Sequence, residues 1–249
     1  DFFNEIKKAP EGYKTGYRKI DEYIRIHPGT MTLISGRPGN GKSTLMFNLF
    51  LNMAEMYPDK HFYFFAYEEA RRNISLKLLN ILINKNLSEI IKDNNNYKDI
   101  RNTNLEILEK YIKGKYDDIN VINKGKENLN KLMRTNCHII DEPYKIEELS
   151  DIIRDEKAKL KEKGQDIGGI FFDYFQRMKT REPGEIRIKF VNISDKALAI
   201  AKENDIPVIM GAQLKRPTTD KQKGAPPQLD ELKETGSLEE DANTVIAIR

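Results

Sequence analysis

One short stretch of the chain combines three glycines with a lysine and two hydroxyl side chains. It reads Gly-Arg-Pro-Gly-Asn-Gly-Lys-Ser-Thr and satisfies the pattern G-x-x-x-x-G-K-[ST]. Glycines let backbone N–H groups approach phosphate oxygens, Lys42 can reach the β- and γ-phosphates, and the Ser43 hydroxyl can ligate Mg²⁺. The alternative is a glycine-rich turn that binds nothing. We predict a nucleoside triphosphate site formed by Gly36, Arg37, Pro38, Gly39, Asn40, Gly41, Lys42, Ser43 and Thr44.

Two apolar runs end in polar groups that could complete this site. The run Gly168–Asp173 ends in a carboxylate, and the end of a strand is where an open α/β sheet delivers a metal ligand. We therefore predict that Asp173 holds the Mg²⁺ shell through water while Ser43 ligates the ion, although many strands end in a capping Asp. The run Val208–Gln213 ends in an amide, which can donate to a γ-phosphate oxygen and signal its presence to the following loop.

Hydrolysis also needs a group that orients or deprotonates the attacking water. The apolar run Phe62–Tyr67 is followed by two adjacent carboxylates, Glu68 and Glu69. Neighbouring residues at a strand end point to opposite sides, so only one of them is expected to face the γ-phosphate. Both could instead cap the next helix, whose first turn favours acidic groups. The pattern alone leaves these alternatives open.

Short β-rich runs alternate along the chain with longer segments of helical period. This alternation predicts an α/β fold, in which a mostly parallel central sheet is flanked by helices. The predicted strands are Met31–Ser35, Phe62–Tyr67, Cys137–Asp141, Gly169–Asp173, Pro207–Gln213 and Thr244–Ile248. The predicted helices are Lys42–Met56, Asn73–Ile91, Leu105–Lys113, Ile146–Lys163 and Ile186–Glu203.

Composition excludes several other classes of protein. A hydrophobic content of 39% in 249 residues excludes a disordered chain. The longest apolar runs are far shorter than the roughly 20 residues of a membrane span, so we expect a soluble protein without a membrane partner. The single cysteine, Cys137, excludes an internal disulfide and favours a reducing compartment, the cytoplasm. A net charge of +3 is too small to indicate nucleic-acid binding by itself.

The chain is expected to form one domain over residues 1–249, with residues 1–28 leading into it. Residues 92–136 are rich in Asn and Lys and could be a linker, but Ile and Leu recur there at helical spacing. We interpret them as a polar helical excursion within the same domain. Two segments with Pro and Gly, Thr180–Glu185 and Pro217–Pro227, are predicted loops.

Five stretches, taken in order, resemble the motor domain of DnaB-type replicative helicases. The most specific features are Asp-Tyr-x-Gln after the strand that ends at Asp173, then Gln-Leu-x-Arg, and finally Glu-x-Gly-Ser-x-Glu-x-Asp-Ala. A glycine-rich phosphate loop alone would fit many activities. The stretches are Ser35–Thr44, Ala66–Glu69, Phe171–Gln176, Gly211–Arg216 and Leu232–Ala242.

The resemblance implies a RecA-like P-loop domain that works in a hexameric ring. Such a domain hydrolyses ATP with Mg²⁺ at subunit interfaces, grips single-stranded DNA in the central channel, and unwinds duplex DNA. Primase and a helicase loader are further implied partners. Matched by position, the catalytic residues are Lys42, Gln213 and Glu68, with Glu68 as the general base. Glu69 stands where the family often has Met.

Local charge is consistent with DNA contact near two strand ends. Residues 177–189 carry five basic side chains against two acidic ones, and residues 215–223 carry four against one. Basic strips of this kind favour phosphate backbones, although such surface loops are often only solvated. The DNA-contact candidates are Arg181, Arg187, Lys215, Arg216, Lys221 and Lys223.

The resemblance also implies a lysine and an arginine supplied by a neighbouring subunit, from a segment beyond residue 249. We therefore expect the 249 residues alone to be mainly monomeric in dilute solution and slow in hydrolysis. Two other classes share part of the pattern. One is a RecA/RadA-like recombinase or clock-type ATPase; the other is a non-motor, helicase-like accessory protein that binds nucleotide. Glu68 argues against the accessory protein, and the final acidic motif favours the helicase.

Overall fold

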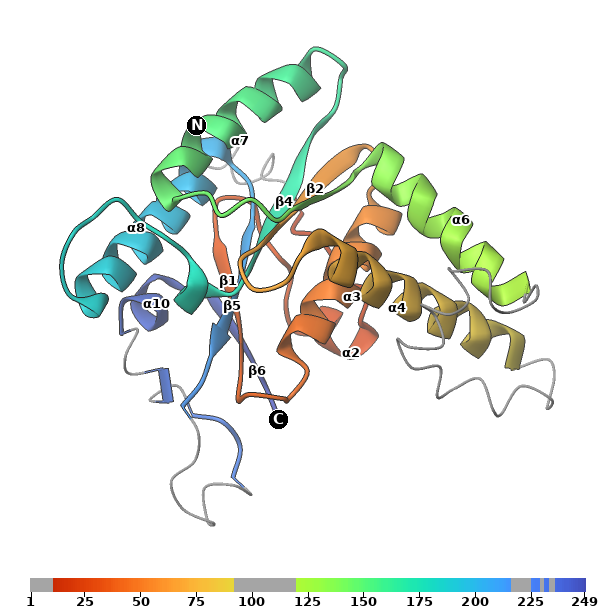
Figure 1. Cartoon of the computed structure of the whole chain (residues 1–249), viewed down its shortest axis with the longest axis horizontal. Coiled ribbons are helices and arrows are strands. Elements are labelled where there is room, and N and C mark those ends of the chain that lie inside the picture. The colour runs from red at the N-terminus through yellow and green to blue at the C-terminus, as the bar shows by residue number, and fades with distance from the viewer. Residues whose placement is uncertain (1–10, 92–119, 216–224, 229–230, 233–235) are drawn as a thin grey trace.

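The computed structural model describes residues 11–91, 120–215, 225–228, 231–232 and 236–249 (Figure 1). Their centre is a six-stranded sheet in the order β3-β2-β4-β5-β1-β6, and every pairing is parallel. This arrangement confirms the predicted fold class. The strands are β1 (Met31–Gly36), β2 (Lys60–Ala66), β3 (Cys137–Ile140), β4 (Asp166–Asp173), β5 (Val208–Gln213) and β6 (Thr244–Ile248).

Helices cover both faces of the sheet, as Figure 1 shows. One face packs against α3 (Lys42–Met56), α4 (Arg71–Ile91) and α6 (Asn120–Thr135), and the other against α7 (Ile146–Lys161), α8 (Ile186–Asn204) and α10 (Gly236–Asp241). A sheet buried on both faces needs continuous apolar strands. The strand β2 shows this, since Phe62 and Phe64 enter the first core and Tyr63 and Phe65 the second. Short helices α2 (Arg18–Asp21) and η2 (Phe175–Arg177) complete the described elements.

Aromatic packing fixes α3 against the sheet. The ring of Phe50 lies edge-on to Phe64 and to Phe171, with ring centroids 5.5 Å apart in both pairs. Phe47 packs on Phe64 at 5.0 Å, and all four rings are buried. Because α3 begins directly after the glycine-rich loop, this packing holds the loop in place.

The predicted elements agree closely with the observed ones. All six strands are found, β6 with its predicted bounds, and the others differ by at most three residues at an end. The sequence analysis interpreted residues 92–136 as a polar helical excursion without giving bounds for a helix. The described part of this segment contains α6, whose Ile122, Leu129 and Leu132 are buried in the first core. The predicted helix Leu105–Lys113 lies outside the described residues. Within the described part, no helix has the length and hydropathy of a transmembrane segment.

Candidate active site

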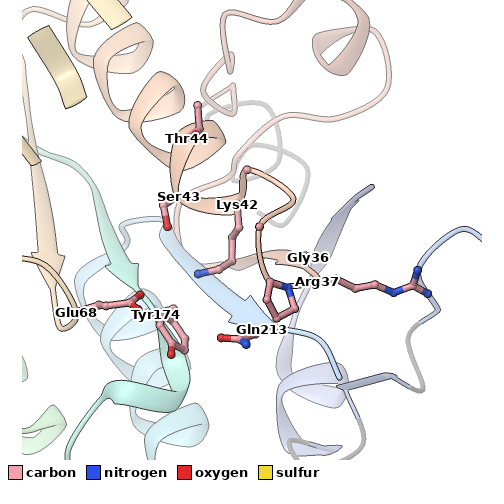
Figure 2. Close-up of a pocket in the computed structure, with 11 residues that line it drawn as sticks. Gly36, Arg37, Lys42, Ser43, Thr44, Glu68, Tyr174 and Gln213 are labelled. Carbon is pink, nitrogen blue, oxygen red and sulfur yellow. The ribbon is translucent and has the colours of Figure 1, made fainter. Parts of the chain in front are cut away.

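A pocket of about 530 Å³ opens where the chain leaves β1, β2, β4 and β5 at the carboxyl edge of the sheet (Figure 2). This edge is where open α/β sheets bind ligands. Nearly all of the predicted nucleotide-binding residues line the pocket, and Glu68 and Gln213 join them. The lining consists of Gly36, Arg37, Pro38, Gly39, Gly41, Lys42, Ser43, Thr44, Glu68, Tyr174 and Gln213.

The glycine-rich loop needs glycine for its backbone conformation. Gly39 and Gly41 have φ values of 84° and 83°, in the left-handed region that L side chains rarely adopt. A Cβ at either position would meet no atom within 4 Å, so space is not the constraint. Gly41 is the N-cap of α3, and the first turn of that helix has no acidic residue. The loop and helix start therefore present N–H groups and partial positive charge to an anion.

Lys42 and Asp173 form an ion pair beneath the pocket. Their Nζ and Oδ1 atoms lie 2.9 Å apart, and the side chains are only 11% and 8% exposed. The ammonium also lies 4.2 Å from the centre of the Tyr174 ring. Gly211 makes room for the pair, because a Cβ there would lie 3.3 Å from Asp173 Oδ1 and 3.4 Å from Lys42 Nζ. The structure thus brings the two predicted residues together.

The oxygen groups at this site suit a magnesium ion. Ser43 lines the pocket at the first turn of α3, and Asp173 ends the neighbouring strand next to Lys42. A hydroxyl and a carboxylate are hard oxygen ligands of the kind Mg²⁺ prefers alongside water and phosphate. Within the described residues, no group of three or more His, Cys, Asp and Glu side chains could hold a metal alone. The residues present fit an ion that arrives with a phosphate ligand.

The structure separates the two adjacent glutamates. Glu68 lines the pocket, on the same side as Tyr174 in Figure 2. Glu69 is instead an ion-pair partner of Lys77 on α4. Both follow β2, and their side chains diverge as the strand geometry predicts. Glu68 is therefore the carboxylate available to a water in the pocket.

Gln213 is held at the pocket by its backbone. It is the last residue of β5 and pairs in register with Gly36 of β1. The side-chain amide nitrogen of Gln176 donates to the Gln213 backbone carbonyl at 3.0 Å. The side-chain oxygen of Gln176 accepts from the Gln213 backbone N–H at 3.1 Å. These bonds leave the side chain of Gln213 among the pocket-lining groups (Figure 2). They also connect it to the turn after β4.

Tyr174 belongs to the site, although the sequence analysis did not select it. Its ring lines the pocket and packs on the Lys42 ammonium. A side-chain hydrogen bond to Tyr174, aided by the nearby charge of Glu68, raises the pKa of Arg177 above its usual value. The signal was present in the sequence, because Tyr174 directly follows the predicted metal ligand Asp173 in the Asp-Tyr-x-Gln motif.

The guanidinium of Arg37 points away from the pocket (Figure 2). Its Nε and Nη2 atoms donate to the two oxygens of Glu231 at 2.9 and 2.7 Å. The predicted role of Arg37 in ligand binding is thus left to its backbone, while its side chain contacts a distant part of the chain. Sequence reasoning did not single out Glu231. Thr44, the last residue of the predicted loop, is among the residues that line the pocket. Within the loop, the backbone N–H of Asn40 donates to the Arg37 carbonyl at 3.1 Å.

The predicted DNA contacts are only partly described. Arg181 is exposed but pairs with Glu148 of α7 at 3.1 Å. Arg187 lies exposed in the first turn of α8, and Lys215 is exposed just after β5. Arg216, Lys221 and Lys223 lie outside the described residues.

Comparison with known proteins gives consistent matches over nearly the whole chain. The family model of the DnaB-like helicase C-terminal domain matches residues 12–249. The replicative DNA helicase DnaB of Leifsonia xyli subsp. xyli is 29% identical over 245 residues, which cover 95% of this chain and 46% of the relative. The Helicobacter pylori protein of the same name is 27% identical over 238 residues, which cover 94% of this chain and 43% of the relative. The chain thus spans less than half the length of these relatives.

Solved structures show the same fold. One of them, described as an ATPase domain, superposes with a TM-score of 0.74 at 19% identity, covering 99% of this chain and 80% of that one. A DnaB-like replicative helicase, studied for its interactions with primase, superposes with a TM-score of 0.75 at 20% identity. The match covers 99% of this chain and 55% of that one. These neighbours confirm the RecA-like fold that the resemblance implied.

Proposed function

We propose that this chain, which belongs to the family of DnaB-like helicase C-terminal domains, is an ATP-driven motor that moves along single-stranded DNA and unwinds duplex DNA. The observation that carries the proposal is the pocket itself. Its glycine-rich loop, the Lys42–Asp173 pair and Glu68 come from three different parts of the chain and converge at one sheet edge. Phosphoryl transfer needs this combination of phosphate cradle, metal ligand and base.

In this proposal each side chain has a defined task. The loop N–H groups and Lys42 bind the phosphates, and Glu68 accepts a proton from the attacking water. Ser43 and Asp173 hold Mg²⁺, which neutralises charge developing on the phosphates. Lys42 must exchange Asp173 for phosphate oxygens when ATP binds, because the two side chains form an ion pair in the structure. Gln213 donates to the γ-phosphate and reports it to the segment after β5.

The family supports the remaining parts of the proposal. We expect the motor to work as a hexameric ring in the cytoplasm, with ATP between subunits and a lysine and an arginine supplied by the neighbour. Primase is a further expected partner, because one structural neighbour was studied with primase. A helicase loader is expected because a closed ring must open to admit DNA. The exposed Arg187 and Lys215 are the described residues that support contact with DNA.

The deciding experiment measures the ATPase rate of the chain with and without single-stranded DNA, together with its mass in solution with a nonhydrolysable ATP analogue. We expect Mg²⁺-dependent hydrolysis that DNA stimulates. Because a neighbouring subunit is expected to supply catalytic cations, the deciding case is an assembled ring: hydrolysis that is absent even where the mass shows a ring, while the analogue still binds, would favour the non-motor accessory protein. Unwinding and strand-exchange assays on the same preparation test the remaining alternative, since strand exchange without unwinding would favour a recombinase.

A further inference from the structure

Glu231 joins three parts of the chain. Its carboxylate accepts two hydrogen bonds from Arg37 of the glycine-rich loop. Its backbone carbonyl accepts from the N–H of Lys215, which has just left β5. Its own N–H donates to the Gln228 carbonyl at 3.1 Å. The next residue, Leu232, is 2% exposed in the second core, so this junction is fixed to the body of the domain.

The Arg37–Glu231 contact is a two-pronged ion pair with little solvent access. The two side chains are 9% and 19% exposed. Hydrogen bonding from Arg37 holds the pKa of Glu231 below its usual value, so both groups remain charged at neutral pH. Paired, parallel N–H···O bonds fix direction as well as distance. Arg37 Nη1 also lies 3.4 Å from the Ala225 carbonyl, a second contact with the same returning segment.

The geometry connects this pair to the phosphate site. Arg37 follows Gly36 directly, and the Gly36 carbonyl accepts from the N–H of Leu214 at 3.0 Å. The chain therefore leaves β5 beside the start of the glycine-rich loop, and Glu231 brings it back to the same loop. Phosphates are bound by the backbone of this loop, whereas the Arg37 side chain points the other way (Figure 2). A ligand that fixes the loop backbone leaves the contact with Glu231 in place.

We propose that Glu231 is a positioning residue that transmits nucleotide binding from the glycine-rich loop to the chain that follows β5. Ligand binding fixes the backbone of Arg37, and the ion pair then stabilises the hydrogen bonds of Lys215 and Glu231. By linkage, anything that binds and orders this segment strengthens nucleotide binding by the same factor. The inference rests on the proposed nucleotide site and adds the route by which that site affects residues 214–215, 225–228 and 231–232.

The test is hydrogen–deuterium exchange of the 249-residue chain, with and without a nonhydrolysable ATP analogue and Mg²⁺. In the wild type we expect slower exchange on binding, both in peptides from the glycine-rich loop and in peptides covering 211–215 and 225–232. In Glu231→Gln the loop should still be protected. The protection of peptides covering 225–232 should be lost, and that of peptides covering 211–215 should weaken, because Gln213 still contacts the ligand there. Glu231→Asp keeps the negative charge and should retain part of the protection of these two peptides. Glu240→Gln, an exposed acid on α10, is the matched control and should behave as the wild type.

The outcomes separate the two proposals. If Glu231→Gln binds the analogue and its peptides 211–215 and 225–232 are still protected, the role of Glu231 is wrong and the nucleotide site stands. If the wild type itself shows no protection of the glycine-rich loop, both proposals fail. Should Glu231→Gln not fold, the comparison passes to Glu231→Asp. In Glu231→Asp, weaker protection of the two peptides than in the wild type, with unchanged protection of the glycine-rich loop, supports the role of Glu231. Protection of the two peptides equal to that of the wild type overturns it.

Discussion

The nucleotide pocket and the basic segment of residues 177–189 both follow carboxyl ends of strands, yet they hold their charges differently. In the pocket, Lys42 and Asp173 neutralise each other at the place where a ligand would separate them. In the basic segment, Arg181 is paired with Glu148, a residue of the neighbouring helix α7. Backbone topology assembles the first region, and side-chain packing between a loop and a helix assembles the second.

Glu147 illustrates how packing controls the basic segment. Its carboxylate accepts bonds from the Thr180 hydroxyl, the Arg181 N–H and the Asn192 amide. Partial burial would raise its pKa, but these hydrogen bonds outweigh it and lower the pKa to about 2. One end of the segment is thereby fixed to α7 and α8. The difference is that both members of the Lys42–Asp173 pair belong to the proposed site, whereas Arg181 of the basic segment is paired with Glu148, a residue of α7 outside that segment.

The largest expected effect is on hydrolysis and comes from Glu68→Gln. This change removes the base and leaves the phosphate cradle and the metal ligands, so ATP binding should persist. We expect kcat to fall by about 10²- to 10⁴-fold. Steady-state kinetics and nucleotide binding measured on the same preparation will check it. Glu69→Gln is the control. Because Glu69 pairs with Lys77, this variant should hydrolyse ATP at a nearly normal rate. The reverse result would mean that the wrong glutamate has been assigned.

Lys42→Ala should have the next largest effect. The ammonium meets mainly the β- and γ-phosphates, so ATP should be weakened more than ADP, and kcat should fall by about 10²- to 10³-fold. The variant also leaves Asp173 without its ion-pair partner. Binding of ATP and ADP by calorimetry will distinguish the two ligands. Equal losses for both would contradict the placement of Lys42 at the γ-phosphate.

The pocket could be predicted from the sequence, because its residues follow backbone rules. A glycine-rich loop after a strand and carboxylates at strand ends must meet at one edge of a parallel sheet. The strand pattern alone could not choose between Glu68 and Glu69, and the family resemblance assigned the base to Glu68. The contact between Glu69 and Lys77 appears only in the structure. The same holds for Arg37, whose partner Glu231 lies 194 residues away in the chain. Charge counts placed Arg181 near DNA but could not show that Glu148 already binds it.

The helix α6 shows a similar limit for the fold. Its sequence is rich in Asn and Lys, so composition suggested a polar excursion. The structure shows that Ile122, Leu129 and Leu132 form a narrow apolar stripe buried in the first core. Only five of the 16 residues of α6 are apolar, namely Val121, Ile122, Leu129, Leu132 and Met133, so composition hides the stripe. The packing of α6 against α4 shows which face is covered.

A smaller effect, on stability, is expected for Glu147→Gln. Three hydrogen bonds to an ionised acceptor become bonds to a neutral amide, which we expect to cost about 1 kcal/mol at neutral pH. Because the folded-state pKa lies below the usual 4.5, the contribution of Glu147 is present above pH 4.5 and is lost as the pH falls toward 2. Urea unfolding across this range should show the variant and the wild type converging. The control is Glu182→Gln, which replaces an exposed acid of the same segment. If Glu182→Gln lowers the stability as much as Glu147→Gln does, the special role of Glu147 is wrong.

The smallest expected effect compares two arginines of the basic segment. Arg187 makes no ion pair within the described part of the chain, so a phosphate contact through it costs no internal partner. Replacing it with Ala should lower the slope of log affinity against log salt by about 0.7 for single-stranded DNA. Arg181→Ala should lower the slope by less, because DNA must first displace Glu148 at 3.1 Å.

A third variant, Glu148→Gln, makes this comparison decisive. It removes the competing carboxylate and leaves Arg181 in place, so it should strengthen binding and steepen the salt slope. Fluorescence anisotropy with a labelled oligothymidylate at several salt concentrations measures all three variants. If Arg181→Ala flattens the slope as much as Arg187→Ala, and Glu148→Gln changes nothing, the internal pair does not compete with DNA.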